Sequence, residues 1–348
     1  MITCLIGAVL LVYSLCIFYL RIRLPKWRSN THLEEKTSFT IVVPSNKREE
    51  LEGSALQQLC KLYGKQLVIV NDSQVKAFPK KLQGALLLEN KGFGKKSALT
   101  TGIQSSSEEW IITTDADCTH QKGWAESMLS GNEKSEVILG PVGLDVSEGF
   151  LHGFEVTEHM ALQGVTRASA AMNRATLANG ANLAFKKATF QQLKGYESHE
   201  HVPSGDDVFL VFSAQERGAS VGYQHQLSAA VYTRANSNWS DFFKQRRKWI
   251  SKLRHYPTNL ANSLAWSVLL ANFFMACAMI YILFEFNGIL LTGILLKLLA
   301  DAVLAWPQRV LISKPPSFFA LLYYGLLYPY YLIVLVIYST IKREEVPK

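Results

Sequence analysis

The sequence predicts an α/β domain with a mostly parallel sheet and helices on both faces, joined to transmembrane helices on its N-terminal and C-terminal sides. Three observations support this prediction. Short β-branched runs alternate with amphipathic stretches between residues 39 and 256. Uncharged apolar runs flank that region on both sides, and basic residues gather where the two kinds of segment meet.

The charge distribution excludes several classes of protein. The 348 residues are 49% hydrophobic and 18% charged, with a formal net charge of +8. Residues 21–28 carry +4 and residues 239–256 carry +5, so the rest of the chain is slightly acidic. Such clusters are typical of the cytoplasmic flanks of membrane helices, and they argue against a nucleic-acid partner. The five cysteines contain no CxxC pair, which argues against a disulfide framework or a zinc ribbon.

Residues 1–22 are predicted to form an N-terminal transmembrane anchor, followed by a linker over residues 23–38. The stretch 2–20 is uncharged and long enough to cross about 30 Å of hydrocarbon as a helix. A cleaved signal peptide is the alternative, but its basic residues would precede the apolar run, whereas here they follow it. This order places the next domain in the cytoplasm, at a plasma or inner membrane.

Residues 39–256 are predicted to form the cytosolic catalytic domain. Four short apolar runs indicate buried strands, at 40–44, 67–72, 85–89 and 110–115. Two amphipathic stretches, 48–63 and 93–106, fit the helices between them.

Residues 257–342 are predicted to hold two or three C-terminal membrane helices, followed by a tail over 343–348. Neither 257–284 nor 315–341 contains a charge, and Pro329 predicts a kink in the second run. The positive-inside tendency is not fully satisfied by either two or three crossings.

A third apolar run, 286–306, contains Lys297 and Asp301, which lie four residues apart and so on one helical face. A functional intramembrane site is one interpretation of this pair. The other is a short or interfacial helix with a snorkelling ion pair.

Asp115 and Asp117 directly follow the fourth predicted strand. Ligands of open α/β sheets bind beyond the carboxyl ends of the strands, so both acids are expected at that crevice. Paired carboxylates suit Mg²⁺ or Mn²⁺, which binds one or two of them together with substrate phosphates. An acidic pair in a surface turn is the structural alternative.

Three further segments are candidates for chemistry. Residues 90–97 open a helix with glycines and lysines, which favours a phosphate, although a solvated basic helix start would look the same. Asp206 and Asp207 precede a helical run, as ordinary capping acids or as acceptors of a hydroxyl proton. Residues 245–249, QRRKW, fit a lipid-binding basic helix or a cationic and aromatic site for a diphosphate and a sugar.

Taken in order, PSN at 44–46, ND at 71–72, NKGFGKKSAL at 90–99, DAD at 115–117, SGDD at 204–207 and QRRKW at 245–249 resemble the family 2 glycosyltransferases. The resemblance covers about residues 39–250 and is to the membrane-embedded branch with a QxxRW motif. It implies a GT-A fold and inverting transfer of a sugar from a nucleotide diphosphate donor.

The resemblance also implies roles for individual residues. Pro44 and Asp72 would line the nucleotide pocket and Lys95 would approach the donor. Asp115 and Asp117 would match the DxD motif that holds the diphosphate and the metal. Asp207 would be the catalytic base.

Asp206 would support that base. Gln245 and Trp249 would match the QxxRW positions near the acceptor and diphosphate. Lys248 stands where Arg is usual in the family, so diphosphate contact could pass to Arg246 or Arg247 because lysine lacks the bidentate fork.

The resulting hypothesis is a metal-dependent hexosyltransferase with a nucleotide diphosphate sugar, in particular a UDP-sugar, as donor and a membrane-associated lipid or glycan as acceptor. The layout is similar to ceramide glucosyltransferases, and membrane lipids are expected partners. A processive polysaccharide synthase is the alternative within the family. A nucleotidyltransferase and a non-catalytic protein that binds anionic lipid are the alternatives from other classes.

Overall fold

The computed structural model describes residues 1–28, 37–72, 79–82, 84–132, 134–199, 202, 205–257 and 260–341. The chain forms two compact units. We call residues 25–145 and 170–234 the sheet unit, and residues 1–24, 146–169 and 235–348 the helical unit. The continuous stretch 39–256, predicted as the catalytic domain, therefore contributes residues to both.

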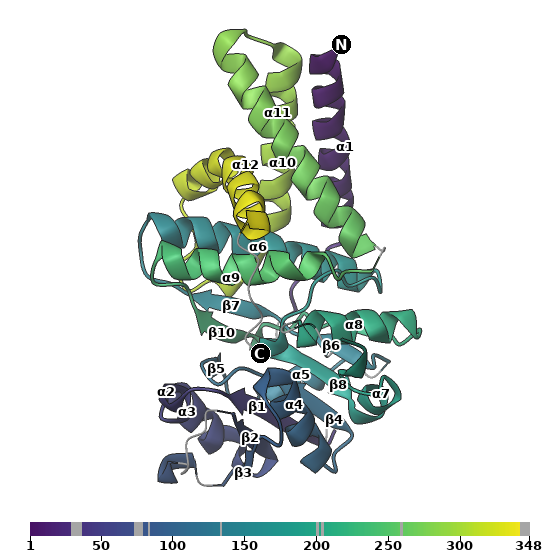
Figure 1. The fold of residues 1–348 in the computed structure, drawn as a ribbon, viewed down its shortest axis with the longest axis vertical. Coiled ribbons are helices and arrows are strands. Elements are labelled where there is room, and N and C mark those ends of the chain that lie inside the picture. Colours follow the sequence, from purple (N-terminus) through teal and green to yellow (C-terminus); the bar gives the residue numbers. More distant parts are fainter. Residues whose placement is uncertain are drawn as a thin grey trace. The chain divides into compact units, whose positions relative to one another are not determined.

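The larger sheet has the strand order β3-β2-β1-β4-β8-β6-β9. The strands β1 (Phe39–Ser45), β2 (Leu67–Asn71), β3 (Leu86–Glu89) and β4 (Trp110–Thr113) are parallel, as predicted for four of the apolar runs. Beyond them, β8 (Leu183–Lys186) runs antiparallel to β4 and to β6 (Val137–Leu139), and β9 (Val221–Tyr223) is parallel to β6. The mostly parallel α/β sheet is therefore confirmed (Figure 1).

A smaller sheet lies in the same unit. Its order is β5-β10-β7, with β5 (Thr119–His120) antiparallel and β7 (Val142–Asp145) parallel to β10 (Val231–Arg234). These strands are too short to give a clear period-2 signal, and no sequence pattern predicted them.

Helices cover both faces of the larger sheet because side chains alternate along each strand. Ile41 and Val43 pack with α3 (Ser54–Tyr63) and α5 (Trp124–Leu129) in one core. Val42 points the other way and packs with α4 (Gly94–Ser105), α7 (Lys187–Gln192) and α8 (Asp206–Glu216) in a second core.

Two glycines explain local geometry in this unit. The helix expected over 48–63 is interrupted between α2 (Arg48–Leu51) and α3, and a side chain at Gly53 would approach the carbonyl oxygen of Glu50 to 3.1 Å. In α4, a Cβ at Gly102 would lie 2.4 Å from a methyl group of Val42. Only glycine lets α4 approach the sheet this closely.

Short 3-10 turns complete the unit at Gly64–Gln66, Lys80–Leu82, Gly180–Asn182, Glu197–His199 and Leu227–Ala229.

The helical unit consists of α1 (Ile2–Arg23), α6 (Phe150–Ala171), α9 (Trp239–Leu253), α10 (Leu260–Phe284), α11 (Gly288–Ala305) with its 3-10 extension Trp306–Leu311, and α12 (Phe318–Ile341). Among the described residues, four helices are long and apolar enough to cross a membrane: Ile2–Arg23, Leu260–Phe284, Gly288–Leu311 and Phe318–Ser339. This is compatible with an integral membrane protein. Residues 342–348, including the predicted tail, lie outside the described chain, as do residues 29–36 of the predicted linker.

Lys297 lies inside the helical unit, where its side chain is 1% exposed. Its Nζ is 2.8 Å from Oδ1 of Asn272 on α10 and 2.9 Å from Oδ2 of Asp301. The hydroxyl of Tyr13 on α1 donates to Asp301 at 2.9 Å. Snorkelling would place the ammonium group outside the bundle, so this pair acts instead as a polar contact among three helices. We call it the Lys297 cluster.

Candidate active site

Three structural elements of the sheet unit bring charged side chains together. Asp115 follows the end of β4, Lys95 lies in the first turn of α4, and Asp206 opens α8. Nζ of Lys95 is 2.7 Å from Oδ1 of Asp115 and 3.8 Å from Oδ2 of Asp206. The structure thus brings together residues predicted from three separate motifs. We call this group, together with Asp207, the acid cluster.

Gly180 completes the acid cluster, although no sequence motif selected it. Its backbone N–H donates to Oδ2 of Asp207 at 3.0 Å. A Cβ at this position would lie 3.4 Å from a carboxylate oxygen of Asp206 and 3.5 Å from Nζ of Lys95. The glycine therefore keeps the space beside these charges open. Because it reaches the cluster through a turn before β8, which pairs with β4, only the tertiary fold reveals it.

Asp207 is held by the backbone on both oxygens. Oδ2 accepts from Gly180, and Oδ1 accepts the N–H of Val208 at 2.7 Å. These bonds fix the orientation of the carboxylate at the start of α8. An acid so oriented can accept a proton from a hydroxyl that comes within hydrogen-bond reach.

The acid cluster stays accessible to a ligand. The side chains of Lys95 and Asp115 are 39% and 37% exposed, whereas that of Asp206 is 11% exposed. Burial by itself lowers the pKa of Lys95, but the charges of Asp115 and Asp206 outweigh it and hold that pKa well above its usual value. Lys95 is therefore a stable cation.

Tyr196 is a neighbour of the acid cluster that the motifs did not predict. Burial and the charge of Asp206 raise the pKa of its phenol, so its side chain is neutral.

Asp117 is solvent-exposed next to Asp115. Partial burial of its carboxylate and the charge of Asp115 raise the pKa of Asp117. Among the described residues, no group of three His, Cys, Asp or Glu side chains forms a metal site. Two carboxylates nevertheless suit a divalent ion that takes its remaining ligands from substrate phosphates and water, so the residues fit Mg²⁺ or Mn²⁺.

The ends of β1 and β2 lie side by side in the parallel sheet. Pro44 pairs in register with Val70, and the N–H of Asp72 donates to the carbonyl of Ser45 at 2.7 Å. Asn90 donates through Nδ2 to Oδ1 of Asp72 at 2.6 Å, so the carboxylate expected near the nucleotide is held in place. Ser204, the first residue of the SGDD motif, lies outside the described residues.

The QRRKW residues belong to α9 in the helical unit. Gln245, Lys248 and Trp249 are exposed, and Arg247 is half-buried with its guanidinium 5.6 Å from the ring centre of Tyr338. Arg246 differs from the other four because it is buried and paired with carboxylates of α6.

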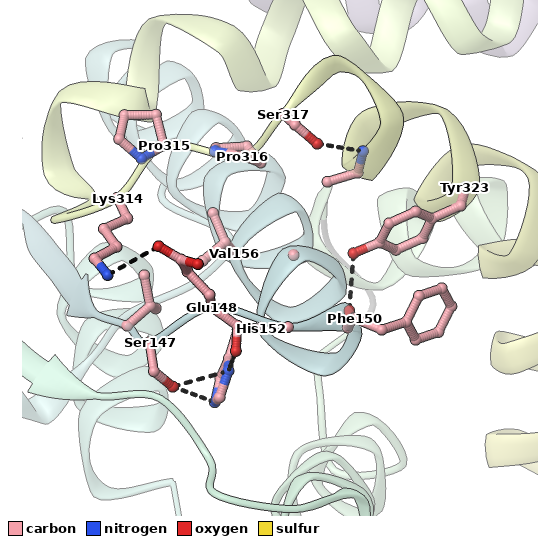
Figure 2. Close-up of a pocket in the computed structure, with 14 residues that line it drawn as sticks. Ser147, Glu148, Phe150, His152, Val156, Lys314, Pro315, Pro316, Ser317 and Tyr323 are labelled. Atoms are coloured by element: carbon pink, nitrogen blue, oxygen red, sulfur yellow. Dashed lines mark hydrogen bonds and ion pairs between the residues drawn. The ribbon is translucent and has the colours of Figure 1, made fainter.

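A cavity of about 400 Å³ lies in the helical unit, between the start of α6 and the segment that leads into α12 (Figure 2). Its polar groups bind one another: Nζ of Lys314 is 3.3 Å from Glu148, and the hydroxyl of Tyr323 donates to the carbonyl of Phe150 at 2.8 Å. In the part of the chain that the structure describes, the residues assigned from the motifs do not line this cavity.

Models of known protein families match the chain over the residues of the acid cluster. The model for glycosyl transferase family group 2 matches residues 110–339, about two thirds of the chain. The chain belongs to glycosyl transferase family group 2. The model for glycosyl transferase family 2 matches residues 40–152, which include Lys95, Asp115 and Asp117.

Individual relatives are distant. A probable glycosyltransferase of Bacillus subtilis, YdaM, is 22% identical over 248 residues, which are 65% of this chain and 57% of that protein. The chain thus spans little more than half the length of that relative. The mannosyltransferase PcManGT from Pyrobaculum calidifontis, solved with GDP-Man and Mn²⁺, has a TM-score of 0.55 at 14% identity, with 97% of this chain and 100% of that chain covered. This likeness and the mostly parallel sheet confirm the GT-A type of fold.

Proposed function

We propose that this protein transfers a sugar from a nucleotide diphosphate sugar to a hydroxyl group of a membrane-associated acceptor, with inversion at the anomeric carbon. The observation that carries the proposal is the acid cluster, in which Lys95, Asp115 and Asp206 meet beside the fixed carboxylate of Asp207. Family membership supports the class of reaction. The GDP-Man and Mn²⁺ of PcManGT support a nucleotide sugar donor and a divalent metal.

Each of these residues would have a separate chemical role. Pro44 and Asp72 lie at the strand ends where the nucleoside would bind. Asp115 and Asp117 would hold a divalent ion, which would neutralise charge on the departing diphosphate. Lys95 would add a fixed positive charge close to that diphosphate.

Asp207 would act as the general base. The acceptor oxygen forms a bond to the anomeric carbon while the bond from that carbon to the diphosphate oxygen breaks, and its electron pair leaves with the nucleoside diphosphate. The hydroxyl proton passes to the carboxylate of Asp207. A single displacement from the opposite face inverts the configuration. Asp206, between Lys95 and Asp207, would support the base.

The acceptor is proposed to be a lipid. Four apolar helices accompany the sheet unit in one chain, which favours an acceptor that resides in the bilayer. The basic residues 21–28 follow α1, which favours a cytoplasmic location for the sheet unit.

The decisive experiment supplies purified protein in lipid vesicles with a panel of radiolabelled nucleotide sugars, with Mn²⁺ or Mg²⁺ present. We expect one donor to be consumed and the label to enter the lipid extract as a single addition. Label in an insoluble polymer would favour the processive alternative. If no donor is hydrolysed or transferred, the proposal is wrong.

A further inference from the structure

Arg246 is the most deeply buried residue of the QRRKW segment, with a side chain that is 4% exposed. Its Nε is 2.7 Å from Oε2 of Glu158, and its Nη1 is 3.5 Å from Oε1 of Glu155. Both carboxylates come from α6 and are also buried, at 3% and 7% exposure. The hydroxyl of Tyr331 on α12 donates to the other oxygen of Glu158 at 3.4 Å. Arg246 therefore joins α9 to α6, in contact with α12.

This environment argues against Arg246 as a ligand of the diphosphate. One buried guanidinium faces two carboxylates, so a further anion would meet net negative charge at close range in a medium of low dielectric. Withdrawing the guanidinium toward a ligand would leave Glu155 and Glu158 buried without their partner, and that is strongly unfavourable. Anion binding in this segment is thus left to Arg247 and Lys248.

The same guanidinium contacts both residues that the motif places near the substrate. Its central carbon lies 4.4 Å from the ring centre of Trp249 and 4.2 Å from that of Phe242, so it makes cation–π contacts with two aromatic rings of its own helix. Nη1 of Arg246 also donates to Oε1 of Gln245. One side chain therefore touches the amide of Gln245 and the face of Trp249.

A second connection reaches Gln245 from the same carboxylate. Asn236 donates to Glu155 through its backbone N–H at 2.9 Å and through Nδ2 at 2.6 Å. Nδ2 of Asn236 is also 3.1 Å from Oε1 of Gln245. Glu155 thus reaches the amide oxygen by two routes, through Arg246 and through Asn236.

We propose that Arg246 is a positioning residue, which Glu155 and Glu158 fix against α6 so that it sets the orientation of Gln245 and Trp249. The substrate contacts of these two residues rest on the proposed function, whereas their orientation by Arg246 does not. The planar guanidinium is needed, because a compact lysine ammonium lacks the fork that bonds Glu155, Glu158 and Gln245 while it contacts two rings.

The first experiment measures position without using activity. The protein is labelled with 5-fluorotryptophan, and the resonance of Trp249 is assigned from its loss in Trp249→Phe. We expect Arg246→Lys and Glu158→Gln to shift and broaden that resonance. Lys248→Met, a matched change on the exposed side of α9, should leave it in place. An unchanged Trp249 resonance in both Arg246→Lys and Glu158→Gln would overturn the proposal, whether or not the protein turns over a sugar donor.

The second experiment separates positioning from anion binding. In Arg246→Lys we expect kcat for transfer to fall between about 10-fold and 100-fold, as for a misplaced substrate contact, with unchanged affinity for a nucleoside diphosphate. In Lys248→Met we expect that affinity to fall. If Arg246→Lys weakens nucleoside diphosphate binding as much as Lys248→Met does, Arg246 is a direct ligand and the positioning role is wrong. If the wild type transfers no sugar, the proposed function fails, and the Trp249 resonance still decides the role of Arg246.

Discussion

The two units hold charged side chains of the same types in opposite environments. In the acid cluster of the sheet unit, Lys95 and Asp115 are more than one third exposed. In the helical unit, Arg246 is 4% exposed and Lys297 is 1% exposed. All four belong to ion pairs, so pairing alone does not separate a binding site from a structural contact. Exposure does.

Energetics explains why exposure matters. An exposed ion pair contributes at most about 1 kcal/mol, so a phosphate or a metal ion can open it at little cost. A buried pair that loses one partner leaves an uncompensated charge, which costs on the order of 3 to 5 kcal/mol. The exposed pair of Lys95 and Asp115 can therefore rearrange around a substrate, whereas Arg246 and the Lys297 cluster hold helices together.

The largest effect is expected at Asp207. Asp207→Asn keeps one of the two oxygens that accept a backbone N–H but cannot take the hydroxyl proton, so transfer should fall by between about 100-fold and 10,000-fold. Affinity for the nucleotide sugar should persist. Single-turnover transfer and equilibrium donor binding, measured on the same preparation, check both parts. Full transfer by this variant would remove Asp207 as the base.

A large loss of stability is expected at Lys297. Lys297→Met leaves Asp301, whose side chain is 25% exposed, with Tyr13 as its remaining partner in the cluster, and the free energy of unfolding should fall by on the order of 2 kcal/mol, less than for a fully buried carboxylate. Unfolding with a denaturing detergent measures this. The double variant Lys297→Met with Asp301→Asn should recover much of the loss because it removes both charges. Equal stability of the single variant and the wild type would show that the pair is not structural.

A smaller, pH-dependent effect is expected at Asp117. Its raised pKa means that this carboxylate takes up a proton at a higher pH than an ordinary aspartate does, and the protonated form does not bind a metal ion. Affinity for Mn²⁺ should fall on acidification, approaching about tenfold per pH unit below that pKa. Paramagnetic resonance of free Mn²⁺ follows the titration. Asp117→Asn should bind Mn²⁺ more weakly and with a weaker pH dependence; an unchanged profile would exclude Asp117 as a ligand.

The smallest effect is expected at the exposed pair of Lys314 and Glu148, whose side chains are 57% and 87% exposed. Glu148→Gln should change the free energy of unfolding by less than about 1 kcal/mol. The same detergent titration used for Lys297→Met provides the measurement. A loss as large as that of the buried pair would break the link between exposure and structural role.

The sequence predicted the four-stranded parallel part of the larger sheet because its signals are local. Strand-length apolar runs identified β1 to β4, and Asp115 could be expected at a strand end because a parallel sheet gathers its carboxyl ends at one edge. Gly180 and Tyr196 carried no local signal. They reach the acid cluster through the pairing of β8 with β4 and through burial near α8, which depend on contacts between distant segments.

The sequence also could not separate Arg246 from its neighbours. In QRRKW, three adjacent cations look alike, and periodicity alone does not say which one faces α6. Arg246 faces α6 because it pairs with Glu155 and Glu158, which lie about 90 residues earlier in the chain. The roles of Gln245, Arg247, Lys248 and Trp249 stay predictions, since no observation on them tests substrate contact.

The hydrogen bond from Tyr13 to Asp301 joins residues that are 288 positions apart in the chain. At a synthesis rate of about 5 to 20 residues per second, roughly 15 to 60 s pass between the emergence of one partner and the other. During that time α11 has not been synthesised, and Tyr13 cannot bind Asp301. The contact between α1 and α11 can therefore form only after most of the chain has been synthesised, when α12 is the one helix of this unit still to follow among the described residues.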